Sequence, residues 1–184
     1  MKRRIALALI HHPVLDRAGE VVTTSMTNMD LHDMSRSAKS YGLEAMYVVH
    51  PIEAQRELVR RIRDHWVEGS GKNRIPDRAV ALELLRCVVT FEEALADLGP
   101  GTEIWTTAAK ARGPEVQSYA EARARLTDGE RPIMIVFGTG WGLAPSVIDA
   151  ATVRLEPIAA AEPTGYNHLS VRAACAITLD RLLG

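Results

Sequence analysis

The chain has 184 residues, 47% of them hydrophobic, and a formal net charge of −1 at neutral pH. This length suits one well-buried domain, so we expect residues 1–184 to fold as a single domain. The near-zero charge excludes a protein that binds polyanions through its overall charge, and apolar runs of about seven residues are too short to cross a bilayer.

Strand and helix patterns alternate through the N-terminal part. The apolar run Ile5–Ile10 predicts a buried strand. Apolar residues at steps of three and four predict an amphipathic helix between the N-cap candidates Thr24–Asn28 and the stop residue Gly42. Ala45–Val49 predicts a second strand, and Pro51–Val67 predicts a long polar helix.

The middle of the chain is less regular. The polar, glycine-containing segment Glu68–Asn73 predicts a mobile surface loop. Ala81–Val89 fits a helix or a strand, but Thr90–Glu93 has the spacing of a capping box, which places a strand before it and a helix after it. Gly99–Gly101 ends that helix, and Glu103–Thr107 predicts the next strand.

The C-terminal part continues the alternation. Pro114–Leu126 predicts a helix, Arg131–Phe137 a strand, and Pro145 the first turn of a short helix. A strand near Thr152–Leu155 and a final helix over Leu169–Leu183 follow. Repeated strand and helix with nearly continuous apolar strands predicts an α/β fold with a mostly parallel sheet and helices on both faces.

A glycine loop follows the strand that ends at Phe137. Gly138, Gly140 and Gly142 lie within five residues, where the missing Cβ atoms let backbone approach a ligand, although a tight structural turn has the same pattern. Ligands of parallel sheets bind beyond the carboxyl ends of the strands. Three segments converge there: Thr106–Lys110, Gly138–Leu143 and Ile158–Ser170.

The order of these three loops, ending in Gly165-Tyr166-Asn167-His168-Leu169-Ser170-Val171-Arg172, resembles the SPOUT superfamily of S-adenosylmethionine-dependent RNA methyltransferases. The resemblance spans residues 5 to 183. It is greatest to a small bacterial group of stand-alone RNA methyltransferases, relatives of which are joined to a tRNA guanine-N1 methyltransferase domain. It implies a C-terminal trefoil knot that holds the cofactor, which periodicity and spacing do not indicate.

The resemblance also implies which residues bind S-adenosylmethionine. They are Thr106, Thr107, Ala108, Phe137, Gly138, Thr139, Gly140, Trp141, Gly142, Leu143, Leu155, Ile158, Asn167, His168, Leu169 and Ser170. Backbone groups of Gly138, Gly140 and Ile158 would contact adenine and ribose. The side chain of Asn167 would contact the ligand, or it would cap the last helix or fix the loop.

Candidate catalytic residues lie in Asp30-Leu31-His32-Asp33-Met34-Ser35-Arg36, where many relatives have Asn-x-Gly-x-x-x-Arg. Arg36 matches the arginine and could orient a phosphate or stabilise negative charge on the acceptor. Asp30 replaces the asparagine, so Asn28 is the candidate for the missing amide. Asp30, His32 and Asp33 are candidate bases for the acceptor proton, and a surface ion pair between Asp33 and Arg36 is the alternative.

The expected partners are a structured RNA such as tRNA and a second copy of the chain. The basic segment Arg56–Arg78 would help to hold phosphates, although a solvated helix face has the same pattern. The resemblance implies that the apolar final helix belongs to a dimer interface as well as to the core. The widely separated Cys87 and Cys175 indicate reduced thiols in the cytoplasm, and the histidines lack the spacing of a metal site.

Two alternatives to an RNA methyltransferase remain at this point. An NAD-dependent oxidoreductase would normally carry its glycine loop after the first strand. A non-catalytic RNA-binding or assembly protein could keep the fold and lack the acceptor chemistry, which the aspartate at position 30 leaves open.

Overall fold

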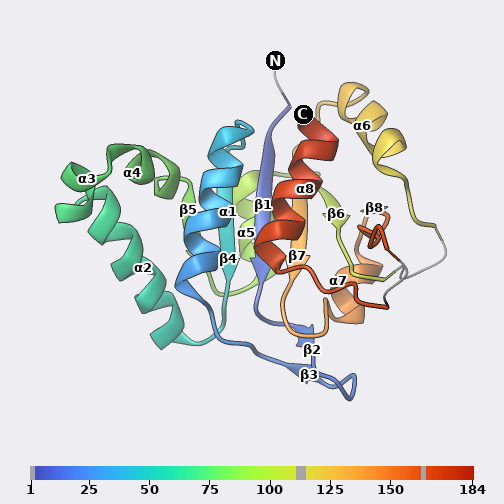
Figure 1. Cartoon of the computed structure of the whole chain (residues 1–184), viewed down its shortest axis with the longest axis horizontal. Helices are drawn as coiled ribbons and strands as arrows, with labels where there is room; N and C mark the ends of the chain where they lie inside the picture. Colours follow the sequence, from blue (N-terminus) through green and yellow to red (C-terminus); the bar gives the residue numbers. More distant parts are fainter. Residues whose placement is uncertain (1–2, 111–114, 163–164) are drawn as a thin grey trace.

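The computed structural model describes residues 3–110, 115–162 and 165–184. Six parallel strands form one sheet in the order β5-β4-β1-β7-β6-β8 (Figure 1). These strands are β1 (Ile5–Ile10), β4 (Ala45–Val49), β5 (Leu85–Val88), β6 (Glu103–Thr106), β7 (Ile133–Gly138) and β8 (Val153–Arg154). A separate antiparallel hairpin consists of β2 (Val14–Leu15) and β3 (Val21–Val22).

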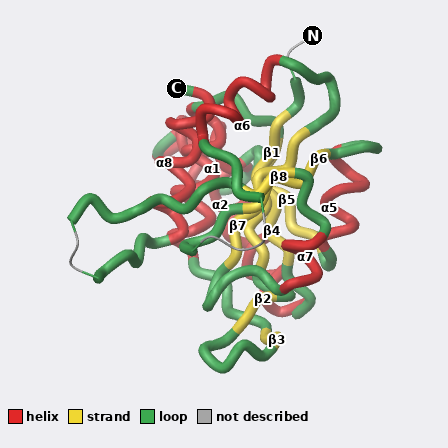
Figure 2. The backbone as a smooth tube through the Cα atoms, turned by 90° about the vertical axis from the view of Figure 1, so that its right-hand side faces the viewer, coloured by secondary structure: helices red, strands yellow, loops and turns green. Residues whose placement is uncertain are grey.

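Helices cover both faces of the sheet (Figure 2). The helices are α1 (Asn28–Ser40), α2 (Glu53–Val67), α3 (Ser70–Arg74), α4 (Pro76–Leu82), α5 (Phe91–Leu98), α6 (Tyr119–Thr127), α7 (Pro145–Asp149) and α8 (Val171–Leu183). Side chains of α1, α2, α4, α6 and α8 join the hydrophobic cluster on one face, and those of α5 and α7 join the cluster on the other. The predicted α/β class is therefore confirmed.

The central strand β1 is apolar throughout because both of its faces are buried. Leu7 and Leu9 belong to the cluster under α1 and α8, whereas Ala6, Ala8 and Ile10 belong to the cluster under α5 and α7. Because neighbouring residues of a strand point to opposite faces, a strand buried on both faces has no polar position. The predicted strands Ile5–Ile10 and Ala45–Val49 have the observed bounds.

The prediction of a mobile loop over Glu68–Asn73 was wrong, because α3 occupies most of this segment. Its glycines allow close packing on α2. A Cβ at Gly69 would lie 2.8 Å from the carbonyl oxygen of His65, and one at Gly71 would lie 2.7 Å from Cε3 of Trp66. The glycines of this segment thus serve helix packing.

The starts of helices α6 and α8 differ from the sequence interpretation. Helix α6 begins at Tyr119, after a capping box of Ser118 and Glu121, and not near Pro114, which lies outside the described residues. Helix α8 begins at Val171 and not at Leu169. Ser170 caps it by accepting a hydrogen bond from the backbone N–H of Ala173, so the prediction that Asn167 caps this helix was wrong.

The Thr90 capping box is present only in part. Thr90 accepts from the backbone N–H of Glu93, but the Glu93 carboxylate accepts from the N–H of Val89. The hairpin β2–β3 and helix α4 were not predicted, and the trefoil knot stays a prediction. No helix in the described part of the chain is long and apolar enough to cross a membrane.

Candidate active site at the carboxyl edge of the sheet

The three predicted cofactor loops begin side by side. The backbone N–H and the Oγ1 of Thr107 both donate to the carbonyl oxygen of Val136, at 3.1 and 2.9 Å. The N–H of Leu155 donates to the carbonyl oxygen of Thr106 at 2.9 Å. The ends of β6, β7 and β8 are therefore joined, as expected for loops that build one site at this edge.

The glycine loop, residues 138–143, is fastened to the β2–β3 hairpin. Trp141 N–H donates to the carbonyl oxygen of Leu15, and Leu15 N–H donates to that of Gly142, both at 2.8 Å. Gly140 has a φ of +59°, and a Cβ there would lie 2.8 Å from the Leu15 carbonyl oxygen. Gly140 is therefore required by the hairpin, whatever the loop binds.

Other residues of the glycine loop are also held by protein contacts. A Cβ on Gly138 would lie 2.8 Å from the backbone nitrogen of Leu143. Thr139 Oγ1 donates to the carbonyl oxygen of Ile10 at 3.1 Å. The side chains of Phe137 and Leu143 are buried in opposite hydrophobic clusters. Any contact of these residues with a cofactor would thus be made by backbone.

The remaining cofactor candidates differ in exposure. Leu155 is buried, Ala108, Ile158 and Asn167 are half-buried, and Trp141, His168, Leu169 and Ser170 are exposed. Apolar side chains beside loop backbone suit the adenosyl group of S-adenosylmethionine, whose flat ring needs apolar walls and whose polar edges need backbone donors and acceptors. The residues present fit this cofactor, and their individual binding roles stay predictions.

The acidic candidates of α1 are engaged by an arginine of α8. Asp30 is buried, and its Oδ2 accepts from Thr27 Oγ1 at 2.6 Å. Arg172 Nη1 donates to Asp30 Oδ1 at 2.9 Å, and Arg172 Nε lies 3.3 Å from Asp33 Oδ2. Arg36 Nη1 lies 3.8 Å from Asp33 Oδ1, so the ion pair considered for Asp33 and Arg36 is present.

His32 turns toward other helices. Its ring meets that of Trp66 edge to face, with centroids 5.5 Å apart. Burial lowers its pKa, and the charge of Arg78 lowers it further. Asn28 is exposed at the first turn of α1. The structure thus brings Asp30, Asp33 and Arg36 into one charged group and separates His32 into a cluster with α2 and α4.

Two buried histidines follow the neighbouring strands β1 and β4. The rings of His11 and His50 lie 5.3 Å apart, and Thr24 joins them. His50 Nε2 donates to the carbonyl oxygen of Thr24 at 3.0 Å, and His11 Nδ1 lies 3.1 Å from Thr24 Oγ1. Thr24 Oγ1 also contacts Thr139 Oγ1. This chain of contacts links α1, through the segment before it, to the glycine loop.

Stability is expected to fall as the pH drops from 6.5 toward 4, because His11 is buried in its neutral form. Burial, and after it the neighbouring His50, lowers the pKa of His11 from 6.5 to about 4. In this window the unfolded chain binds a proton at His11 that the folded chain does not, which costs up to about 1.4 kcal/mol per pH unit.

Chemical denaturation at several pH values measures this loss of stability. The variant His11→Asn keeps a donor near Thr24 and carries no titrating ring, so it should lose less stability between the two pH limits. An equal loss in the variant and the parent protein would show that His11 is not responsible.

The arginines of the basic segment Arg56–Arg78 are less available to phosphates than the sequence indicates. On α2, arginines pair with acids of the same helix, and these pairs are Arg56 with Glu53, Arg60 with Glu53 and Glu57, Arg61 with Glu57, and Arg63 with Asp64. The Arg78 guanidinium lies over the Trp66 ring, 4.6 Å from its centroid. Lys72 and Arg74 of α3 are exposed.

A family model described as SAM-dependent RNA methyltransferase matches residues 4–184. The chain belongs to this S-adenosylmethionine-dependent RNA methyltransferase family. The description of this family names S-adenosylmethionine as the cofactor and RNA as the molecule that is methylated. The family assignment removes the support for the oxidoreductase alternative.

Relatives and solved structures agree with this assignment. A tRNA (guanine-N(1)-)-methyltransferase of Oleidesulfovibrio alaskensis is 41% identical over 184 residues, which are 99% of this chain and 42% of that protein. The chain thus spans less than half the length of this relative. A probable methyltransferase from Bordetella pertussis has a TM-score of 0.65 at 19% identity, covering 98% of this chain and 94% of that one.

A third comparison identifies the fold. A TrmH/SpoU tRNA modifying enzyme of Aquifex aeolicus has a TM-score of 0.59 at 14% identity, covering 99% of this chain and 76% of that one. The predicted SPOUT-like fold is therefore confirmed.

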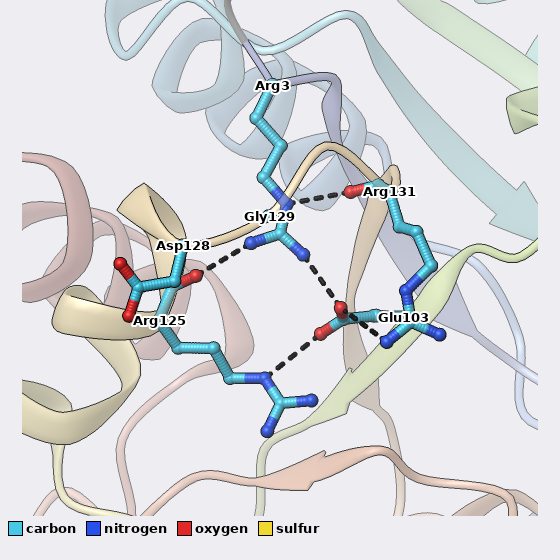
Figure 3. Close-up of a pocket in the computed structure, with 6 residues that line it drawn as sticks. All are labelled: Arg3, Glu103, Arg125, Asp128, Gly129 and Arg131. Atoms are coloured by element: carbon cyan, nitrogen blue, oxygen red, sulfur yellow. Dashed lines mark hydrogen bonds and ion pairs between the residues drawn. The ribbon is translucent and has the colours of Figure 1, made fainter.

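A cavity of about 280 Å³ lies elsewhere in the molecule (Figure 3). Its lining residues are Arg3, Glu103, Arg125, Asp128, Gly129 and Arg131. Glu103 begins β6, so this cavity lies at the amino ends of the strands, opposite the three loops. The residues that line it form ion pairs around the buried Glu103, as Figure 3 shows, and we interpret this cluster as structural.

Proposed function

We propose that this methyltransferase modifies a structured RNA, with tRNA as the favoured class, in the cytoplasm and as a homodimer. The tRNA substrate in the name of the Oleidesulfovibrio relative supports the RNA class. The location of the site rests on the junction of the three loops, where Thr106 accepts a hydrogen bond from Leu155 and Thr107 donates to Val136.

The chain's contribution to the reaction is mainly positioning. S-adenosylmethionine supplies an activated methyl group, so acceleration comes from holding the acceptor in line with it. Backbone of residues 138–142 and the apolar side chains Ile158 and Leu169 would hold the adenosyl group. Arg36, whose side chain is 59% exposed, is free enough to reach an acceptor phosphate or a developing negative charge.

The candidates for the proton acceptor are narrowed by their contacts. Both oxygens of Asp30 are occupied, by Thr27 and by Arg172, so Asp30 serves the structure of α1 rather than proton transfer. Asp33 and His32 remain. Burial lowers the pKa of His32, which favours the neutral ring, the form that can accept a proton.

The homodimer would form around α1, α8 and the loops at this edge. Met29 is 60% exposed, Trp141 55% and Leu169 46%. Large exposed apolar side chains at one end of a molecule mark interaction surfaces. Exposed Lys72 and Arg74 of α3 extend the surface that would contact RNA phosphates.

The test begins with calorimetric titration of S-adenosylmethionine, followed by transfer of a radiolabelled methyl group to bulk tRNA and to other structured RNA. Arg36→Ala should lower the transfer rate by at least about tenfold and leave cofactor affinity unchanged, because Arg36 acts on the acceptor. Arg61→Ala, which removes an arginine of α2 paired with Glu57, is the matched control.

Each other outcome has a definite meaning. Cofactor binding without methylation of any structured RNA would favour the non-catalytic RNA-binding alternative. Arg36→Ala with a normal rate would remove Arg36 from the acceptor site. A monomer in sedimentation experiments at working concentration would contradict the dimer.

A further inference from the structure

We propose that Arg172 is a positioning residue that couples the acceptor side of the site to the loop preceding α8 and keeps Arg36 available to the acceptor. This inference rests on the proposed function. Arg172 is the second residue of α8, directly after the predicted cofactor loop that ends at Ser170. Its two carboxylate partners, Asp30 and Asp33, both lie on α1.

The geometry requires a guanidinium group. Nη1 of Arg172 is 2.9 Å from Asp30 Oδ1, and Nε is 3.3 Å from Asp33 Oδ2, so two N–H groups of one planar fork reach two different carboxylates. The single ammonium of a lysine has no such fixed fork. Arg172 therefore fixes the start of α8 relative to the first two turns of α1.

Asp30 depends on Arg172 for charge compensation. The Asp30 side chain is only 8% exposed, and Thr27, which donates to its other oxygen, is uncharged. Asp30 also lies in the first turn of α1, where the partial positive charge of the helix end favours a carboxylate. Without Arg172 the Asp30 carboxylate would be a buried charge that has lost its ionic partner, which is strongly destabilising.

Asp33 is shared between two arginines, which gives Arg172 a second effect. Arg172 lies 3.3 Å from Asp33, and Arg36 lies 3.8 Å from its other oxygen. Because Arg172 satisfies part of the Asp33 charge, the more distant Arg36 is held weakly and can leave for an anionic acceptor. Loss of Arg172 would strengthen the attraction of Asp33 for Arg36 and hold it away from the acceptor.

The experiment separates this role from simple stabilisation. The variants are Arg172→Ala, Arg172→Lys and the double variant Arg172→Ala with Asp30→Asn, in which an amide replaces the uncompensated carboxylate. Arg181→Ala, an exposed arginine of the same helix, is the control. For each we would measure the melting temperature, the affinity for S-adenosylmethionine by calorimetry, and kcat and KM on tRNA.

Arg172→Ala should melt at a lower temperature, lose about tenfold in kcat, and bind the cofactor about fivefold more weakly, with KM for RNA nearly unchanged. Arg172→Lys should recover the melting temperature more than kcat. The double variant should regain the melting temperature of the parent protein, yet keep the losses in kcat and cofactor affinity. Arg181→Ala should leave kcat and cofactor affinity unaltered.

Full recovery of kcat and cofactor affinity in the double variant would overturn the proposal, because Arg172 would then only compensate a buried charge. Unchanged cofactor affinity in Arg172→Ala would overturn the coupling to the cofactor loop. If the parent protein binds S-adenosylmethionine but methylates no RNA, the proposed function fails. The cofactor affinities of the same variants still decide whether Arg172 couples α1 to the loop.

Discussion

Gly140→Ala is expected to weaken the binding of S-adenosylmethionine by about 30-fold, or roughly 2 kcal/mol. Gly140 has a φ of +59°, which strains any residue with a side chain, and its new Cβ would lie 2.8 Å from the carbonyl oxygen of Leu15. Backbone cannot move aside as a flexible side chain can, so the whole glycine loop should shift. Calorimetric titration measures the change.

Gly19→Ala is the matched control for this prediction. Gly19 has a similar φ of +88°, but a Cβ there would meet no atom within 4 Å. The two variants therefore share backbone strain, and only Gly140→Ala has the collision. Equal cofactor affinity in both variants would mean that the contact with Leu15 does not position the loop.

Glu103→Ala is expected to destabilise the protein by about 3–5 kcal/mol, because it leaves the buried guanidinium of Arg3 without its carboxylate. Arg3 lies 2.8 Å from Glu103, Arg131 3.0 Å and Arg125 3.2 Å, and the Glu103 side chain is only 5% exposed (Figure 3). Glu44→Ala is the control, since its pair with Arg4 is solvent-exposed and should contribute less than about 1 kcal/mol.

Denaturation in urea gives both free energies of unfolding. A loss below about 1 kcal/mol for Glu103→Ala would show that the cluster contributes no more than a surface pair.

The ion-pair cluster around Glu103 should also weaken in acid. Burial alone would raise the pKa of Glu103, but the hydrogen bond from Trp105 and the charges of Arg125 and Arg3 lower it overall. Its contribution is therefore present above the unfolded pKa and lost as the pH falls below it.

The strands of the sheet could be predicted from the sequence because burial on both faces leaves a simple pattern. A strand buried on both faces must be apolar at every position, so Ile5–Ile10 and Ala45–Val49 have clear ends in the sequence. The hairpin β2–β3 has only two residues in each strand and gives no comparable pattern. The contacts that the hairpin makes with Gly140 could therefore not be predicted, and the sequence left the glycine loop open to two interpretations, a ligand site or a tight structural turn.

The candidate site could be predicted only in part, because some of its contacts join residues that are far apart along the chain. The three loops follow strands, so their shared edge could be predicted from strand order. The partner of Asp30 is Arg172, 142 positions away along the chain, and no local pattern links them. The pairing of the α2 arginines with acids of the same helix could have been predicted. Glu57 and Arg61, for example, are four residues apart, which is the spacing that brings side chains together on a helix.

Both ends of the described chain lie at the amino edge of the sheet, where β1 begins and α8 ends (Figure 1). Arg3 donates to the carbonyl oxygens of Arg125 and Arg131 there, and Arg123 contacts the carbonyl oxygen of Gly184. A protein module joined in tandem to either terminus would thus be attached on the side opposite the three predicted cofactor loops. Genetic fusion or an affinity tag at either end would leave the proposed RNA-binding edge uncovered.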